Sequence, residues 1–222
     1  MLNHNLVQDA FQDALAGLSV CTTGSTTLAA TTTGYTRSSG SFVTDGFLAG
    51  MEVLVDGFAA DGYRVVKTVA ALTLTVDTDE GLLDVEAAAS GRTITCALPE
   101  SVGWEDTEVD RAPAHRGFVS DELVPAATNV RTLPVSGGLM DHTGLYVVRW
   151  HGVPGYGREA ISRCADAVLA LYPPGAFATL SDGAALRIRE TPAPFRGQLL
   201  RLETGGVFTT ITIPYRAEAR NS

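Results

Sequence analysis

Hydrophobic and polar residues alternate over residues 144–151 and then recur at helical spacing, which predicts a strand followed by a helix. In the strand, Tyr146, Val148 and Trp150 share one face, while Arg149 and His151 point the other way. The helix carries one apolar stripe, formed by Ile161, Cys164, Ala165, Val168, Leu169 and Tyr172. Two prolines and a glycine at 173–175 predict its end, because proline offers no backbone N–H. We expect the rest of the chain to pack around this unit.

Residues 2–19 predict a second amphipathic helix, whose apolar stripe needs a partner surface elsewhere in the chain. The stripe consists of Val7, Ala10, Phe11, Ala14, Leu15 and Leu18. Near the other end, residues 184–190 predict a strand with Leu186 and Ile188 facing inward. Residues 198–203 and 207–215 predict a closing hairpin that turns at Gly205 and Gly206.

Residues 20–98 are rich in threonine, serine and glycine and contain short β-patterned runs between turns. Asp45 and Gly46 form a hairpin-type turn signal, and residues 82–89 are the one segment here that could form a helix. Five or six short strands predict a small barrel or sandwich. A flexible threonine-rich linker is the alternative, which the alternation disfavours. Residues 98–143 look loop-rich, with two short β runs at 118–124 and 129–135.

These elements predict an α+β fold, in which an antiparallel sheet has two helices packed on one face. The β-rich block, residues 20–97, then reads as an inserted all-β small barrel, SH3-like or sandwich. Residues 1–19 and 98–222 form one discontinuous domain around it. An inserted domain needs neighbouring ends, so we expect Cys21 and Cys96 to lie close together.

The composition and net charge of the chain argue against several classes of function. The net charge of −9 argues against a surface that binds DNA through its phosphates. No apolar run approaches the roughly 20 residues that span a bilayer, and the first residues lack a signal-peptide layout, so we expect no membrane association. Three widely spaced cysteines form no disulfide framework and fit a reducing cytoplasm.

The strongest enzyme-like motif is G-x-G-x-x-A at residues 155–160, between the strand and the helix. Such a turn can hold a pyrophosphate at a helix start. However, the preceding strand alternates polar and apolar residues, whereas a buried parallel strand would be apolar throughout. Pro154 removes a donor and Glu159 would repel phosphate. The motif therefore predicts a tight structural turn, and a nucleotide-dependent enzyme is a minor alternative.

The sequence contains no other recognisable catalytic motif, and we expect no catalytic, cofactor-binding or metal-binding residues. An acidic run lies near His115 but lacks a known metal-ligand spacing, so it predicts a solvated or partner-facing loop. That run consists of Glu105, Asp106, Glu108 and Asp110. The remaining histidines, His4, His142 and His151, are scattered, and Asp141, His142 and Ser136 match no hydrolase motif. Cys164 predicts a buried small hydrophobic residue.

Cations on the outward faces of the predicted strands suggest either a solvated sheet face or a contact with another subunit. The candidate subunit-interface residues are Arg149, His151, Arg187, Arg189 and Arg201.

The order of several motifs resembles the tail terminator (tail-completion) family of long-tailed bacteriophages. They are LPESVGW after the first helix, a PGYGREA turn into a helix ending at YPPG, and a last strand reading IPYRAE. The likeness covers residues 1–19 and 98–222. The segments GSFVTDGFLAGMEVLVDGF and RVVKTVAALTLTVD resemble small β-barrel modules of other phage structural proteins.

The resemblance implies a structural virion protein rather than an enzyme. Such proteins form a homo-oligomeric ring, commonly a hexamer, on the last ring of the tail tube protein. They stop tube growth at the head–tail junction and contact the head-tail connector or stopper protein. Genomic DNA would pass through the lumen without specific binding, and assembly would occur in the host cytoplasm. The alternative is another connector, or a minor tail protein with an adhesive β module.

Overall fold

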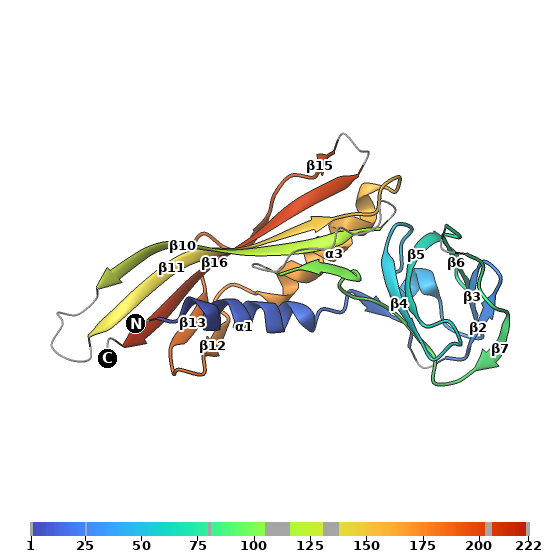
Figure 1. Cartoon of the computed structure of the whole chain (residues 1–222), viewed down its shortest axis with the longest axis horizontal. Helices are drawn as coiled ribbons and strands as arrows, with labels where there is room; N and C mark the ends of the chain where they lie inside the picture. The colour runs from blue at the N-terminus through green and yellow to red at the C-terminus, as the bar shows by residue number, and fades with distance from the viewer. Residues whose placement is uncertain are drawn as a thin grey trace.

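The computed structural model describes residues 2–24, 26–79, 81–104, 116–130, 138–202 and 206–220, and it has the expected α+β fold with few helices. Two sheets stand at the two ends of an elongated molecule, and the chain termini lie together at the end away from the second sheet (Figure 1). The first contains the long strands β10, β11 and β16. The second is a half-barrel built from β1 to β8.

The long sheet has the order β12-β13-β16-β11-β10-β9, and β14 and β15 also pair with β16. Its strands are β9 Ser101–Gly103, β10 Phe118–Val130, β11 Leu139–His151, β12 Phe177–Thr179, β13 Ala185–Ile188, β14 Phe195–Arg196, β15 Leu200–Arg201 and β16 Val207–Arg220. Pairing is antiparallel as predicted, except that β9 runs parallel to β10. The β runs predicted at 118–124 and 129–135 are confirmed as strand up to residue 130, and residues 131–135 lie outside the described residues. The break predicted between the runs was wrong, because β10 continues through a β-bulge at Pro125 and Ala127.

Helices α1, His4–Ala16, and α3, Arg158–Leu171, cover one face of this sheet (Figure 1). Phe11 of α1 stacks on Tyr146 of β11, with ring centroids 4.5 Å apart. The hydroxyl of Tyr172, just after α3, donates to the Phe11 carbonyl oxygen over 2.7 Å. Most of both predicted apolar stripes is confirmed as core, including Cys164. Ala14 is exposed instead, and Ala10 and Leu169 are partly buried.

A glycine in the middle of β11 lets the sheet pack closely. A Cβ atom at Gly144 would lie 2.6 Å from the Tyr215 hydroxyl oxygen and 2.7 Å from the Val124 carbonyl oxygen. Glycine inside a strand often marks such a close approach of neighbouring groups. The Tyr215 side chain is fully buried here, in the layer between sheet and helices.

The half-barrel has the order β1-β8-β4-β5-β6-β3-β2-β7. Its elements are β1 Cys21–Thr22, β2 Leu28–Thr31, β3 Gly34–Arg37, α2 Phe42–Asp45, β4 Glu52–Asp56, β5 Gly62–Val69, β6 Thr73–Val76, β7 Glu86–Ala89 and β8 Thr93–Cys96. Two local predictions were wrong. Residues 86–89 form a strand rather than a helix, and Asp45 ends the short helix α2, which Gly46 closes in the left-handed conformation.

Cys21 and Cys96 are paired neighbours on β1 and β8, where the chain enters and leaves the half-barrel. The backbone N–H of Val20 also donates to the Cys96 carbonyl oxygen over 2.8 Å. All three cysteines are free and buried. Hydrogen bonding with Cys96 and burial raise the pKa of the Cys21 thiol, so it stays protonated and is a poor nucleophile.

Candidate interaction surface

The long sheet has one helix-covered face and one face that we call the open face. Because side chains alternate along a strand, the register assigns every second residue of β10, β11 and β16 to the open face. The open face contains Phe118, Ser120 and Glu122 from β10, Leu145, Val147, Arg149 and His151 from β11, and Phe208, Thr210 and Thr212 from β16. It mixes aromatic, aliphatic, charged and hydroxyl groups, as interaction surfaces do.

Three aromatic rings form a ladder across the open face. His151 stacks on Phe118 with ring centroids 3.8 Å apart, and on Phe208 with centroids 5.2 Å apart. These three residues are directly opposite one another in the strand register. Burial between the rings lowers the pKa of His151 to about 4, and the nearby Arg149 adds to the effect. His151 is therefore a neutral aromatic group near pH 7.

Two sets of ion pairs lie on the same face. Arg149 pairs with Glu122 across β10 and β11, in a partly exposed position. Arg216 pairs with Asp141 at 3.0 Å and with Glu218 at 2.5 Å. The Arg149–Glu122 pair is partly exposed and contributes little to stability, so its clearer role is to fix the orientation of the two side chains. Asp141 is buried beside Arg216.

The structure brings four of the five candidate interface residues to this side of the sheet or its border. Arg187 is exposed and lies opposite Arg216 in the register of β13 and β16. It borders a hollow of about 290 Å³, lined also by Phe177, Ala185, Arg216 and Glu218. The backbone of Arg189 continues the pairing with β16 by donating to the Pro214 carbonyl oxygen over 2.9 Å.

Arg201 lies elsewhere. It pairs with Val207, whose side chain is on the helix-covered face. Directly paired residues point to the same face, so Arg201 also points to the helix-covered face, opposite to its neighbour Leu200. Leu200 pairs with Phe208 and extends the aromatic ladder on the open face, where it is half exposed. Phe195, opposite Thr212, is exposed to the same degree. Sequence analysis missed Leu200 and Phe195, because their place on the open face follows from pairing with β16.

The two edges of the long sheet differ. At one edge, residues 124–129 of β10 are all exposed and extend beyond β9, which pairs only with residues 118–120. At the other edge, all three residues of β12 are exposed, including the large side chain of Phe177. Exposed strand edges are ready templates for pairing with another strand.

The glycine turn at 154–157 contacts the half-barrel. The hydroxyl of Tyr156 donates to an Asp77 carboxylate oxygen over 3.2 Å, and a Cβ atom at Gly50 would lie 2.5 Å from Tyr156 Cβ. The preceding strand, β11, is antiparallel to both of its neighbours, so the parallel sheet of a dinucleotide-binding fold does not surround this turn. The arrangement agrees with a structural turn.

The other candidate chemistry does not assemble into a site. Asp141 and His142 are consecutive on β11 and point to opposite faces, while Ser136 lies outside the described residues. His142 is buried, and its Nδ1 lies 3.0 Å from the Thr128 hydroxyl. The acidic run 105–110 and His115 also lie outside the described residues.

Two whole-chain findings concern the described residues alone. In that part of the chain, no group of three or more His, Cys, Asp or Glu side chains is arranged to hold a metal ion. Within the same ranges, no helix has the length and apolar character needed to cross a membrane.

Comparisons with known proteins give no name to this fold. No known protein family matches the sequence, and no curated protein matches it either. A solved structure is 23% identical over 57% of this chain and 83% of its own length, with a TM-score of 0.42. Its name describes no function, and likeness at this level supports no argument about function or fold.

Proposed function

We propose that this chain is a structural virion protein that forms a ring at the end of a phage tail tube. In this role it terminates tube polymerisation and joins the tail to the head-completion or connector proteins. Two lines of argument support the proposal. One is the ordered resemblance of LPESVGW, PGYGREA and IPYRAE to tail terminators. The other is the shape of the long sheet, whose two edges differ.

The unlike edges are the observation that carries the proposal. A closed ring with one kind of subunit uses head-to-tail contacts, so each subunit needs two different patches that fit each other. Residues 124–129 supply one exposed edge and β12 supplies the other. Pairing these edges between successive copies would extend the sheet around the ring. Arg187 and the hollow beside it would then meet the neighbouring subunit.

The charge of the protein fits a channel for DNA. A formal charge of −9 removes the counterion release that drives nucleic-acid binding, so DNA can pass through the lumen without adhering. The second candidate function is another head–tail connector or a minor tail protein, which the half-barrel would favour if it binds a ligand. The position of the protein in the virion distinguishes these roles.

A proline at the edge of β12 tests the ring. The backbone N–H of Ile188 donates to Ala176, and that of Leu180 donates to Ala184, each over 2.9 Å. Because hydrogen-bonded pairs alternate along an antiparallel ladder, the backbone groups of Thr179 point away from β13 toward the open edge. Thr179→Pro removes that outward N–H and leaves the bonds to β13 intact.

We expect the unchanged protein to form rings by negative-stain microscopy and mass photometry, and Thr179→Pro to remain monomeric with an unchanged circular dichroism spectrum. Thr179→Ala is the matched control, since it shortens the same side chain and keeps the N–H. A parent protein that stays monomeric and does not cap purified tail tubes would refute the proposed function. Rings formed equally well by Thr179→Pro would refute the assignment of this edge.

A further inference from the structure

A second recessed surface lies on the half-barrel, far along the chain from the open face. It is a groove of about 690 Å³, lined by Thr23, Gly24, Thr26, Thr27, Ser38, Ser39, Ser90, Gly91, Arg92 and Thr93. Its volume falls within the range of about 300–1,000 Å³ that is usual for small-molecule sites. Seven of these ten residues are serine or threonine. Among the described lining residues none is acidic or aromatic, and the threonine methyl groups are the aliphatic groups that the lining offers.

The one charged lining residue is already engaged. The guanidinium of Arg92 donates to the carbonyl oxygens of Leu28 and Ala87, over 3.0 and 2.7 Å, and pairs with Glu86 at 2.5 Å. It also lies over the Phe58 ring, 4.4 Å from the centroid. Arg92 therefore holds the strands together, and the groove offers a ligand neutral hydroxyl groups.

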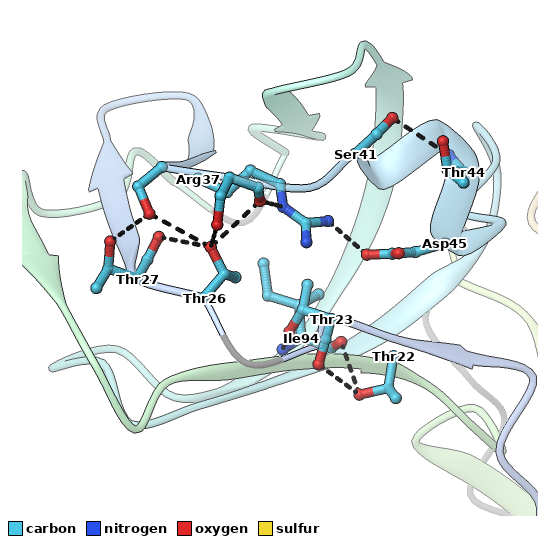
Figure 2. Close-up of polar contacts among 11 residues, drawn as sticks. Thr22, Thr23, Thr26, Thr27, Arg37, Ser41, Thr44, Asp45 and Ile94 are labelled. Atoms are coloured by element: carbon cyan, nitrogen blue, oxygen red, sulfur yellow. Dashed lines mark hydrogen bonds and ion pairs between the residues drawn. The ribbon is translucent and has the colours of Figure 1, made fainter.

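Four of these hydroxyl groups, on Thr26, Thr27, Ser38 and Ser39, form a connected set, and Figure 2 shows their hydrogen bonds. The Thr27 hydroxyl donates to the Ser38 hydroxyl over 2.7 Å, and the Thr26 hydroxyl lies 3.4 Å from that of Ser38 and 3.3 Å from that of Ser39. The longer contacts leave donor and acceptor capacity for a ligand, because each hydroxyl can donate once and accept twice.

A buried arginine supports this set of hydroxyl groups. Arg37 donates through Nε to the Ser39 carbonyl oxygen over 2.6 Å and forms an ion pair with Asp45, at the end of α2 (Figure 2). Its guanidinium lies over the Phe42 ring, 5.0 Å from the centroid. A ligand would therefore meet hydroxyl groups already held in place, which lowers the entropy lost on binding.

From this geometry we infer that the groove binds a neutral oligosaccharide. Sugar hydroxyls both donate and accept hydrogen bonds, so they match a wall of serine and threonine hydroxyls. A phosphorylated or carboxylated polymer finds no uncommitted cation among the described residues that line the groove, and it meets a protein with a charge of −9. Because the lining lacks an apolar platform, the dissociation constant should be on the order of a millimolar. Repeated copies in an assembly would strengthen attachment through multivalency.

Saturation-transfer difference NMR on the full chain tests the inference, since the method observes the sugar and tolerates a large assembly. The probes are oligomers of glucose, galactose, mannose and N-acetylglucosamine, with a galacturonic acid oligomer of equal length as the charged probe. We expect at least one neutral oligomer to give saturable transfer and the charged oligomer to give none. Ser38→Ala with Ser39→Ala should weaken binding about tenfold through two lost hydrogen bonds.

The control is Thr68→Ala with Thr75→Ala. These residues form an exposed hydroxyl pair, 2.6 Å apart, on β5 and β6 of the same half-barrel, outside the groove. This variant should bind as the parent does. Absence of transfer with all four neutral oligomers at tens of millimolar would overturn the inference. So would equal binding of the charged oligomer, or equal weakening by the two variants. None of these results depends on whether the chain forms a ring.

Discussion

His151 shows how the surroundings of one residue decide its chemistry. On the sequence it is a polar residue on the outward side of a strand, grouped with arginines as a candidate interface residue. In the structure it is an aromatic ring between Phe118 and Phe208. Alternation along the strand predicted the face correctly, whereas the stacking depends on strands that are distant in sequence and could not be predicted locally.

Stability should fall in acid because of His151. Its folded pKa is about 4, below the ordinary value of 6.5, so between these pH values the unfolded chain binds more protons than the folded one. The stabilisation is therefore complete above pH 6.5 and is lost as the pH falls toward 4. His151→Phe keeps the stacking and removes this titration. The shift in urea midpoint between pH 7 and pH 5 should become smaller in that variant.

Arg149→Gln provides the control for this prediction. It removes the lesser cause of the lowered pKa and leaves His151 buried between the rings, so most of the pH dependence should persist. Burial of His142 also lowers its pKa, and a residual loss of stability in acid is expected in every variant. An unchanged midpoint shift in His151→Phe would contradict the assignment.

At the scale of elements, long periodic segments could be predicted and their junctions could not. The helices 4–16 and 158–171 and the strand that ends at His151 follow from apolar spacing. The sequence gives no local signal that β10 continues through Pro125, because a bulge in an edge-side strand accommodates the missing N–H. Similarly, Asp45 and Gly46 fit both a hairpin turn and a helix end, and tertiary packing selected the helix end.

Two glycines have similar backbone angles but different surroundings. Comparing the same substitution at both positions therefore separates the cost of backbone strain from the cost of a packing clash. Gly50 has φ of +86° and Gly155 has φ of +84°, a region that costs other residues about 1 kcal/mol. A Cβ atom at Gly155 would meet nothing within 4 Å, whereas one at Gly50 would lie 2.5 Å from Tyr156 Cβ. Gly155→Ala should therefore lower the free energy of unfolding by about 1 kcal/mol, and Gly50→Ala by about 1–3 kcal/mol more. Urea titration of both variants measures the difference, and equal losses would show that the Tyr156 contact does not resist displacement.

The two sheets are connected by packed side chains as well as by the covalent chain. A cavity of about 20 Å³ lies at the junction, with Met51 and Cys96 on one side and Trp150 and Cys164 on the other. Buried residues of both sheets form one continuous hydrophobic cluster. The change in composition at residues 20–98 predicted a separate β-rich block, but it gave no indication that this block packs against α3. The contact forms between residues that are distant in sequence, so it depends on the completed fold and not on a local sequence pattern.

Removing the half-barrel tests how the two parts depend on each other. Val20 and Cys96 are joined by a backbone hydrogen bond of 2.8 Å, so a short Gly-Ser-Gly bridge in place of residues 21–96 spans the gap. We expect the shortened chain to keep the circular dichroism features of the long sheet and its helices. It should unfold cooperatively at a lower temperature than the full chain, because the Trp150 and Cys164 sides of the junction lose their cover.

The same shortened chain separates assembly from ligand binding. If both edges of the long sheet make the ring contacts, deletion of the half-barrel leaves ring formation intact and abolishes oligosaccharide binding. Negative-stain microscopy and saturation transfer on one preparation read both properties. A shortened chain that folds but no longer forms rings would place part of the subunit contact on the half-barrel. That outcome would contradict the pairing of residues 124–129 with β12 as a sufficient contact, since both edges remain in the shortened chain.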